Sequence, residues 1–467
     1  MSTNTPFWKN LRSRQDTAAV IDHDAGTILT YAALHLQVQN AAEQLCGPRR
    51  SLVMLFSNND TASIVCYLAA LEAQQAVFLS PMGIHQASAQ ALLDAYRPEL
   101  VLCRTDAAPV DVAPGYEQAG LVHGYRLLRR CECADEPPHP ALGLVLSTSA
   151  STGSPKAVRL SLTSLSACAD QVAEALALGD ADRSLLCLPL SYVYGLSVLN
   201  SSLHAGAAVV LVKGSSADRA YYAKLASAGV TTIPAVSQIF EHWRRLRVEA
   251  ALLPKLTRLT HSGNALDPEL FAWIYEHVAR RGTRLYLMYG QTEACGRIAV
   301  LPPESLPDRH RSVGRALRGG SLSISERGEI VYRGPGVMLG YAGTREELTL
   351  GDTLQGALHT GDLGYLDREG YLFITGRASR HCKVFGHRVN LDDVEGFARR
   401  ERPVAAIETG GVIAIVFEGA LPDPSSWLMP LARHFQLPPQ SFRLLAVPEL
   451  PRTARGKVAY SSLLSLL

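Results

Sequence analysis

A run of small hydroxyl residues has the clearest chemical meaning in this chain. Residues 147–156 are Ser-Thr-Ser-Ala-Ser-Thr-Gly-Ser-Pro-Lys, and they follow an apolar stretch at 142–146 that predicts a buried strand. Backbone N–H groups, hydroxyls and one lysine ammonium can together neutralise phosphate oxygens without large side chains blocking the approach. The run therefore predicts a polyphosphate-binding loop, with a flexible Ser/Thr linker as the alternative. A Walker A loop is disfavoured, because its glycine–lysine spacing is absent and Pro155 opposes the helix that such a loop begins.

Three further clusters follow in order along the chain. The first, at 289–293 (Tyr-Gly-Gln-Thr-Glu), comes after an apolar stretch and offers a hydroxyl and a carboxylate, the oxygen ligands that Mg²⁺ prefers. The second, at 359–364 (His-Thr-Gly-Asp-Leu-Gly), predicts a tight turn whose carboxylate accepts hydrogen bonds from ribose hydroxyls. The third, at 451–457 (Pro-Arg-Thr-Ala-Arg-Gly-Lys), presents one lysine on an exposed loop. Each cluster alone is weak, and their order along the chain is the stronger observation.

Together the clusters resemble the adenylate-forming superfamily, which includes acyl-CoA and aryl-CoA synthetases, the adenylation domains of nonribosomal peptide synthetases, and firefly luciferase. The resemblance covers nearly the whole chain. Further matching segments are 29–31, 188–196, 262–266, 314–315, 328–330, 333–335, 386–389 and 393–395.

The resemblance implies a fold and an activity. The expected fold is α/β: a large N-terminal domain (1–378) of two sheets flanked by helices plus a small β subdomain, and a small, mobile α+β C-terminal domain (379–467) that rotates about a hinge at Ser379. The expected activity is ATP- and Mg²⁺-dependent conversion of a carboxylic acid to an acyl adenylate, followed by transfer to a thiol. That thiol belongs to CoA or to the phosphopantetheine of an acyl or peptidyl carrier protein.

The resemblance also implies individual roles. Lys457 matches the lysine that bridges carboxylate and α-phosphate, and Thr292 and Glu293 match contacts to phosphate and Mg²⁺. Lys383 and Arg388 lie in the segment that enters the site after rotation in CoA synthetases, so they are candidates for the thioester-forming step. The expected nucleotide-binding residues are Thr148, Ser149, Ser151, Thr152, Gly153, Lys156, Asn264, Ala265, Tyr289, Gly290, Asp362 and Arg377.

Four positions depart from the family pattern. Ala150 and Ala157 stand where relatives usually have Gly, which stiffens the phosphate loop. Ser379 replaces an Asp or Lys at the hinge, and Tyr460 replaces an Arg near the C-terminus. Ala150, Ser379 and Tyr460 motivate a second hypothesis, a catalytically silent nucleotide-binding or regulatory relative. The retained lysine, magnesium-binding carboxylate and ribose-binding carboxylate argue against it.

The expected substrate class depends on the absence of an acidic residue from one segment of the chain. Relatives that activate amino acids place an Asp in the region of 191–194, where this chain has no acidic residue. A substrate ammonium would be buried without a counter-ion, which is costly. We therefore expect an aryl, heteroaryl or short acyl acid without an α-amine, with amino-acid adenylation and luciferase-type oxidation as alternatives. The expected pocket residues are Tyr192, Tyr194, Val236, Ser262, Gly263, Gln291 and Cys295.

The acceptor stays open between CoA and a carrier protein. Arginines gather in the segment 380–402, a face that acidic carrier helices would find attractive. Such a cluster is usually only a solvated surface.

Length and composition limit the number of domains, the partners and the location that can be expected. A chain of 467 residues with 47% hydrophobic residues exceeds the size of one core, so at least two domains are expected. The formal charge of +2 argues against a nucleic-acid surface. The start has no secretory pattern, and no unbroken apolar run of about 18 residues occurs, so we expect a cytoplasmic protein without membrane contact. The nine cysteines are expected as reduced thiols, and a zinc site at 131–133 would need two more ligands.

Alternating strand and helix patterns must position these clusters. Apolar strand-like runs separated by amphipathic stretches predict βαβ units in mainly parallel sheets. The expected strands are 51–56, 76–79, 100–103, 207–212, 230–233, 285–288, 326–333, 370–375, 412–417 and 442–447, and the expected helices are 62–73, 88–96, 218–228 and 237–247.

Overall fold

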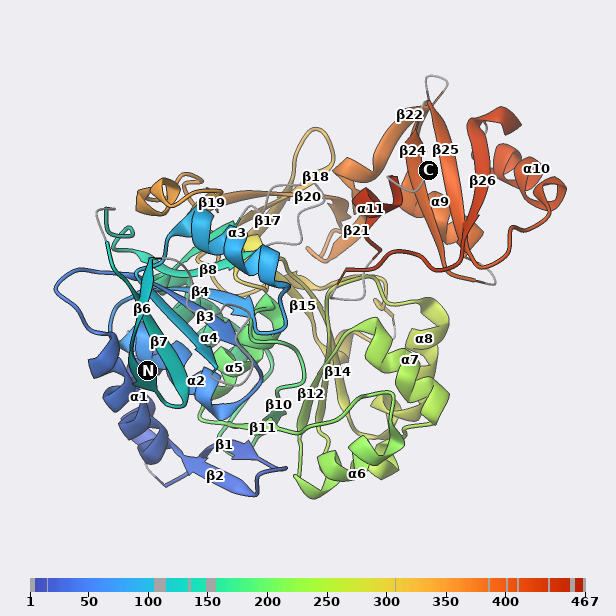
Figure 1. Cartoon of the computed structure of the whole chain (residues 1–467). Coiled ribbons are helices and arrows are strands. Elements are labelled where there is room, and N and C mark those ends of the chain that lie inside the picture. Colours follow the sequence, from blue (N-terminus) through green and yellow to red (C-terminus); the bar gives the residue numbers. More distant parts are fainter. Residues whose placement is uncertain are drawn as a thin grey trace. The chain divides into compact units, whose positions relative to one another are not determined.

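The computed structural model describes residues 5–14, 16–104, 115–132, 136–147, 157–306, 308–384, 387–399, 402–409, 411–435, 437–453 and 458–464 (Figure 1). The chain divides into two compact units. The first unit comprises the described parts of Met1–Thr148, Lys156–Leu322 and Tyr332–Leu358, and the second comprises Ser323–Val331 and the described parts of His359–Leu467.

A nine-stranded sheet forms one half of the first unit. Its strands are, in spatial order, β16 (Arg315–Ala316), β15 (Ala299–Leu301), β14 (Arg284–Tyr289), β13 (Arg258–His261), β12 (Thr232–Ala235), β10 (Arg183–Leu185), β11 (Ala208–Leu211), β1 (Ala18–Asp22) and β2 (Thr27–Thr30). The strands from β14 to β1 are parallel, and the outer pairs are antiparallel. Since parallel strands end at one edge, the segments after β12, β13 and β14 meet there, which is where ligands bind in such sheets.

An eight-stranded sheet forms the other half. Its order is β19 (Gly340–Ala342), β9 (Ala157–Ser161), β8 (Leu142–Ser147), β4 (Ala76–Pro81), β3 (Leu52–Ser57), β5 (Leu100–Arg104), β7 (Tyr125–Arg130) and β6 (Tyr116–Val122). The strands β8, β4, β3 and β5 are parallel and almost entirely buried, which explains their continuous apolar sequences. The predicted pair of parallel-type sheets is confirmed.

Helices cover both sheets, and all of them except α5 and α7 begin at a side-chain cap. They are α1 (Tyr31–Leu45), α2 (Thr61–Glu72), α3 (Gln86–Tyr96), α4 (Leu162–Ala175), α5 (Val193–Ala205), α6 (Arg219–Ser227), α7 (Ser237–Leu246) and α8 (Pro268–His277). Asp60, Ser161 and Asp267 each accept a hydrogen bond from a backbone N–H of the helix that follows. α4 packs on β8 and β9, while α5 packs on α4, β10 and β11, so these two helices join the sheets.

The second unit is α+β. It contains most of a four-stranded sheet, β17 (Ser321–Ile324), β18 (Glu329–Arg333), β20 (Ala357–Leu366) and β21 (Leu372–Arg377), and then the pair β22 (His381–Val384) and β23 (His387–Asn390). A three-stranded sheet of β24 (Val404–Thr409), β25 (Val412–Glu418) and β26 (Phe442–Val447) packs with α9 (Leu391–Ala398) and α10 (Pro424–Phe435), and α11 (Tyr460–Leu464) follows. The predicted strands at 412–417 and 442–447 are confirmed.

Several predicted strands begin later than expected, two of them because a turn comes first. The strand predicted from residue 230 begins at Thr232, because the Val230 N–H donates to Leu225 O and closes the end of α6. The strand predicted from residue 326 begins at Glu329, because a turn closed by Gly328 N–H and Ser325 O precedes it. Among the described residues, none of the helices combines the length and apolar character that crossing a bilayer requires.

Candidate active site

The segment after β14 forms a tight loop. Gly290 has no room for a side chain, because a Cβ there would lie 2.1 Å from Gly296 O. The Gly296 N–H donates to Gln291 O at 2.9 Å, which folds the chain back on itself. A short 3₁₀ helix at Thr292–Ala294 follows, so Thr292 and Glu293 leave the sheet at the edge where β12, β13 and β14 end. The predicted strand, glycine turn and polar pair therefore occur in that order.

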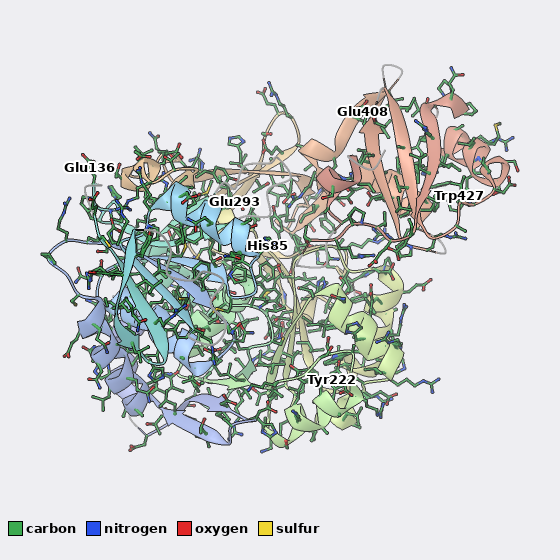
Figure 2. All side chains as sticks on the ribbon, in the orientation of Figure 1. His85, Glu136, Tyr222, Glu293, Glu408 and Trp427 are labelled. Carbon is green, nitrogen blue, oxygen red and sulfur yellow. The ribbon has the colours of Figure 1, made fainter. Side chains whose placement is uncertain are left out.

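A tyrosine from another part of the unit holds the Glu293 carboxylate. β19 is antiparallel to β9, and it brings the Tyr341 hydroxyl to 2.8 Å from Glu293 Oε1, to which it donates. The Met338 N–H also donates to Glu293 O at 2.9 Å. Burial raises the pKa of the Tyr341 phenol, and the Glu293 charge adds to the shift, so the phenol stays a donor. Oε2 of Glu293, whose side chain is labelled in Figure 2, makes no hydrogen bond to a described residue.

This carboxylate suits Mg²⁺. No group of three or more His, Cys, Asp or Glu side chains gathers as a metal site within the described ranges. Magnesium is commonly held by one or two carboxylates together with substrate phosphates and water. An oriented carboxylate with one unoccupied oxygen fits that mode of binding.

Three of the predicted pocket residues converge beside this loop. A Cβ on Gly263 would lie 3.3 Å from the Tyr192 hydroxyl and 3.7 Å from Val236 Cγ1. The φ of Gly263 is +111°, which favours glycine on its own account. Tyr192, Val236 and Gly263 therefore lie together at the ends of α5, β12 and β13.

The remaining predicted pocket residues lie deeper. Tyr194 is buried, and its hydroxyl is hydrogen-bonded to Thr260 O at 2.9 Å and to Thr260 Oγ1 at 2.8 Å. Its ring centroid lies 6.3 Å from that of Tyr192. Ser262 is buried too, whereas Gln291 is half-buried, and its Nε2 has no hydrogen-bond partner among the described residues. Cys295 is buried and lines a cavity of about 10 Å³ with Cys168 of α4.

A buried histidine supports the exposed Asn264–Ala265 segment. His261 Nε2 lies 3.1 Å from Ser237 Oγ, which lies 3.2 Å from Asn264 Oδ1. Because the single Ser237 proton goes to the Asn264 oxygen, we assign Nε2 of His261 as the N–H donor. Burial lowers the pKa of His261 to about 4. The imidazole is therefore neutral near neutral pH.

Arg297 is a residue that the sequence analysis missed. It is 2% exposed, and its Cζ lies 4.0 Å from the centroid of the Tyr194 ring. Nη1 donates to Gly296 O, while Nε has no hydrogen-bond partner in the part of the chain that the structure describes. Burial lowers the pKa of the guanidinium, and the phenols of Tyr194 and Tyr192 oppose that shift. A signal was present, because Arg297 is the one charged residue in the otherwise apolar segment 294–301.

The second unit contains Asp362 and Arg377. The expected tight turn around Asp362 is wrong, because Asp362 lies inside β20 and is paired in register with Arg377 of β21. The extended conformation is held by cross-strand bonds, including Gly361 N–H to Glu329 Oε1 at 2.9 Å. Arg377 Nε lies 3.0 Å from Asp362 Oδ1, and the Asp362 side chain is only 7% exposed. The ribose-binding role of this pair stays a prediction.

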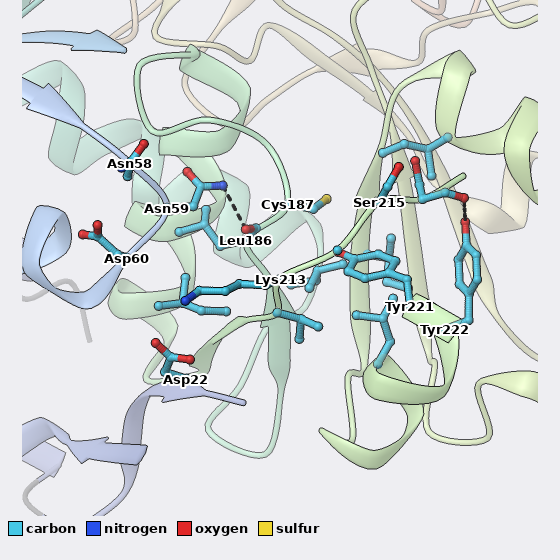
Figure 3. Close-up of a pocket in the computed structure, with 18 of the residues that line it drawn as sticks. Asp22, Asn58, Asn59, Asp60, Leu186, Cys187, Lys213, Ser215, Tyr221 and Tyr222 are labelled. Carbon is cyan, nitrogen blue, oxygen red and sulfur yellow. Dashed lines mark hydrogen bonds between the residues drawn. The ribbon is translucent and has the colours of Figure 1, made fainter. Parts of the chain in front are cut away.

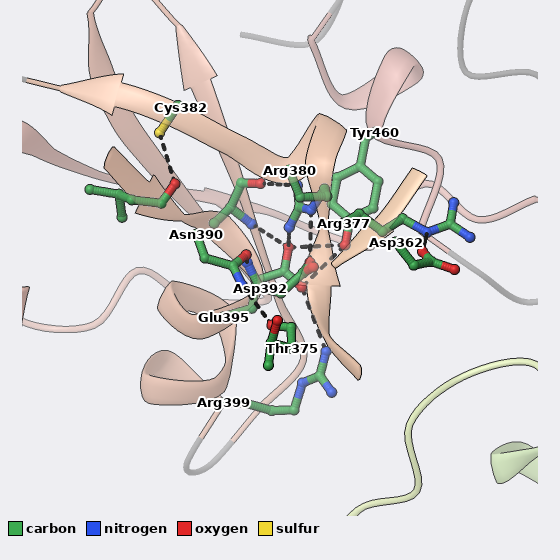
Figure 4. A network of polar contacts seen from close by, with 12 residues as sticks. Asp362, Thr375, Arg377, Arg380, Cys382, Asn390, Asp392, Glu395, Arg399 and Tyr460 are labelled. Atoms are coloured by element: carbon green, nitrogen blue, oxygen red, sulfur yellow. Dashed lines mark hydrogen bonds and ion pairs between the residues drawn. The ribbon is translucent and has the colours of Figure 1, made fainter. Parts of the chain in front are cut away.

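A polar network follows the predicted hinge (Figure 4). Arg380 donates to Asp392 Oδ1 at 2.8 Å and to Ala406 O at 2.6 Å, and it pairs with Glu395. Its Cζ lies 4.0 Å from the centroid of the Tyr460 ring, and the Tyr460 hydroxyl donates to Glu395 Oε1 at 2.9 Å. Tyr460, which departs from the family pattern, thus completes a network around the buried Glu395 carboxylate within the second unit.

Several predicted residues lie outside the described ranges. They are Thr148, Ser149, Ser151, Thr152, Gly153 and Lys156 of the phosphate loop, with Ala150, and Lys457. The backbones of Lys383 and Arg388 are paired in register between β22 and β23, and Ser379 lies in the short 3₁₀ helix Ala378–Arg380. The side chains of these last three residues are likewise outside the described ranges.

A separate cavity of about 800 Å³ opens at the ends of β3, β10 and β11 (Figure 3). Lys213 extends across it, with Tyr221 and Tyr222 on one side and the 58–60 segment on the other. None of the predicted site residues lines it. Cys187 and Ile239, which line the cavity, pack against the apolar cluster that contains Tyr194, as Tyr192 and Val236 also do. The cavity is lined by Asp22, Asn58, Asn59, Asp60, Arg104, Leu185, Leu186, Cys187, Leu211, Val212, Lys213, Gly214, Ser215, Ser216, Tyr221, Tyr222, Leu225, Ile233, Ile239 and Trp243.

Comparisons with known proteins agree with this geometry. The family model described as AMP-binding enzyme matches residues 7–342. A 2-succinylbenzoate–CoA ligase of Bacillus cereus is 30% identical over 366 residues, which cover 75% of this chain and 73% of the relative. An indoleacetate–CoA ligase of Aromatoleum aromaticum is 30% identical over 401 residues, which cover 79% and 75% of the two chains.

Solved structures show the shared fold. The O-succinylbenzoate coenzyme A synthetase of Bacillus subtilis in complex with AMP has a TM-score of 0.79 at 22% identity, over 98% of each chain. ATP-bound MatB from Rhodopseudomonas palustris has a TM-score of 0.79 at 20% identity, over 99% of this chain and 98% of that one. The B. subtilis synthetase has also been solved with ATP and a magnesium ion. The predicted fold class is confirmed.

Proposed function

The chain belongs to the AMP-binding enzyme family, and from this premise we propose that it activates a small carboxylic acid with ATP and transfers the acyl group to a thiol. The observation that carries the proposal is the arrangement at the edge of the nine-stranded sheet. There Tyr341 orients Glu293, which lies just after β14. Tyr192, Val236 and Gly263 converge at the same edge of the sheet. A metal-binding carboxylate beside a half-apolar pocket is what an acid-activating enzyme requires.

The first half-reaction joins the acid to AMP. A carboxylate oxygen of the substrate attacks the α-phosphorus of ATP, the bond from that phosphorus to the β-phosphate oxygen breaks, and pyrophosphate leaves. Bound Mg²⁺ would supply positive charge to the phosphate oxygens. Glu293 would hold the ion through Oε2 while Tyr341 fixes Oε1. Thr292, Lys457 and the loop at 147–156 are proposed to bind the phosphates.

The second half-reaction releases AMP. The sulfur of a thiol attacks the acyl carbon, the bond from that carbon to the AMP oxygen breaks, and the thiol proton is lost. We propose CoA as the acceptor, because the similar B. cereus and A. aromaticum proteins are CoA ligases. The phosphopantetheine of a carrier protein would react through the same thiol. Lys383 and Arg388 are proposed to act in this step.

The acid is proposed to be an aryl or short acyl acid without an α-amine. Tyr192 and Val236 present an aromatic ring and a branched aliphatic group, with one phenol as a polar contact. The 191–194 segment offers no carboxylate to an ammonium group. The acids named for the two relatives, 2-succinylbenzoate and indoleacetate, are both aryl acids.

The test is acid-dependent exchange of labelled pyrophosphate into ATP across a panel of aryl, heteroaryl, short acyl and amino acids. We expect exchange with aryl or short acyl acids, and loss of exchange in Lys457→Ala and Glu293→Gln. Lys255→Ala, at an exposed lysine of the first unit, is the matched control and keeps full activity. ATP binding without exchange for any acid would contradict the proposal. AMP release with CoA or with a phosphopantetheinylated carrier then identifies the acceptor.

A further inference from the structure

Three arginines in the described part of the chain are almost fully buried, and their hydrogen bonding differs. Arg159 is 0% exposed and donates to backbone carbonyls, among them Tyr341 O, Leu339 O and Gly351 O at 3.1–3.2 Å. Arg345 is 1% exposed and pairs with the Glu99 carboxylate at 2.6 Å. Arg297 has one hydrogen bond, to the carbonyl of the residue before it, and no ion pair among the described residues. It is the buried arginine with the weakest set of acceptors.

Burial of such a guanidinium is energetically unfavourable. Burial of a cation without an anion is strongly unfavourable, and stacking on an aromatic ring offsets only part of that penalty. The Tyr194 ring supplies that stacking at 4.0 Å, and the Tyr194 hydroxyl itself is occupied by Thr260. Among the described residues Nε has no hydrogen-bond partner and no anion balances the positive charge. An anion from outside the chain would balance both.

The residues around Arg297 indicate which molecule would carry that anion. The backbone of Arg297 lies against Gly290, where a Cβ would come within 2.8 Å of Arg297 Cα, so the residue belongs to the loop that carries Thr292 and Glu293. Its side chain stacks on Tyr194, which is adjacent to Tyr192 in the proposed acid pocket. A planar guanidinium is suited to bidentate binding of a carboxylate. The anion is therefore expected on the acid substrate.

We propose that Arg297 binds a second carboxylate of the substrate, so that the preferred acid is a dicarboxylate. This inference rests on the proposed function and specifies the substrate class of the same site. One carboxylate is converted to the acyl adenylate, while the other stays ionised against Arg297. A monoacid of the same shape would leave the guanidinium unpaired in the closed site, so the arginine selects against it.

The experiment compares each dicarboxylate with its own methyl monoester. The panel contains benzenedicarboxylates, carboxyphenylacetates and straight-chain dicarboxylates, and the readout is kcat/KM for pyrophosphate exchange. We expect at least one dicarboxylate to exceed its monoester by about 30-fold or more, the range seen when one partner of a buried charge pair is removed. In Arg297→Gln the ratio falls to about 1, with the KM for ATP unchanged. Arg297→Lys keeps the positive charge but loses the planar guanidinium that binds a carboxylate through two hydrogen bonds. Its dicarboxylate-to-monoester ratio is expected to lie between those of the natural protein and Arg297→Gln.

A matched control separates recognition from stability. Arg159→Gln removes a buried arginine whose donors serve backbone carbonyls, so it lowers the melting temperature but leaves the dicarboxylate-to-monoester ratio unchanged. Monoesters preferred by the natural protein, or a ratio that Arg297→Gln does not alter, would overturn the inference. If Arg297→Gln does not fold, Arg297→Lys carries the same comparison.

A binding readout distinguishes failure of the inference from failure of the proposed function. The melting temperature of the full chain is measured with each acid in the presence and absence of ATP. No exchange with any acid would refute the proposed function. In that case a dicarboxylate that raises the melting temperature of the natural protein, but not that of Arg297→Gln, would still support the arginine as a carboxylate site, and no such shift would refute it.

Discussion

His261 makes the stability of the protein depend on pH. Burial lowers its pKa from 6.5 to about 4, so the unfolded chain binds a proton more tightly than the native chain between these values. The stabilisation is therefore fully present above about pH 6.5 and is lost as the pH falls toward 4. Linkage with these two pKa values gives a loss of about 2 kcal/mol in the free energy of unfolding between about pH 7 and pH 5.

Urea unfolding at a series of pH values measures this loss. In His261→Gln the non-titrating amide keeps an N–H for Ser237 and removes the imidazole, so we expect the contribution of about 2 kcal/mol to disappear from the pH dependence. His359→Gln, at a side chain that is 65% exposed, is the matched control and keeps the pH dependence of the natural protein. The pKa itself is measured by NMR of histidine-labelled protein.

Two outcomes would refute this reasoning. The first is an unfolding free energy that falls equally with pH in the natural protein and in His261→Gln. The second is a His261 resonance that titrates near the ordinary histidine value of about 6.5. Either would mean that water reaches the imidazole, or that the chain from His261 through Ser237 to Asn264 is not formed.

Two further predictions concern polar side chains that hold carboxylates. Tyr341→Phe removes the 2.8 Å hydrogen bond to Glu293, and because Tyr341 is 43% exposed we expect a loss of about 1 kcal/mol, seen as a rise of about fivefold in the Mg²⁺ concentration for half-maximal pyrophosphate exchange. An unchanged Mg²⁺ dependence would contradict this role. Tyr460→Phe keeps the ring over Arg380 but removes the donor to Glu395, whose side chain is 6% exposed, so native-state hydrogen exchange of the β24 amides in the full chain should show a loss of about 1–3 kcal/mol. Unaltered protection of those amides would count against the network.

Strand and helix positions were largely predictable from the sequence. Parallel strands buried on both faces have continuous apolar sequences, and β3, β4, β5 and β8 were expected for that reason. Helices with a cap and one apolar face, such as α6, were also located to within a residue or two. The superfamily and the class of enzyme, an AMP-forming acid–thiol ligase, were predicted from ordered motifs and are confirmed. The division at 378–379 stays a prediction.

Pairings between distant segments could not be predicted. Asp362 was expected in a turn because glycines flank it, but in-register pairing with β21 draws the segment into β20. Tyr341 belongs to a short strand that joins β9, far away in sequence, and only that pairing places its hydroxyl beside Glu293. Glycine content describes local backbone freedom, whereas strand pairing is decided by contacts across the sheet.

The acid pocket shows why a motif cannot identify every functional residue. A motif identifies residue types at fixed spacing, and Arg297 has the same identity in the sequence as the buried Arg159. The two arginines differ in the number of hydrogen-bond acceptors around them. That number is determined only when the fold brings β14, α5 and the 290–297 loop together. Arg159 has its acceptors inside the chain, so it stabilises the fold. Arg297 has no such set of acceptors among the described residues, and since a buried cation needs a counter-charge, its place beside Tyr194 is the basis for relating it to the substrate rather than to the fold.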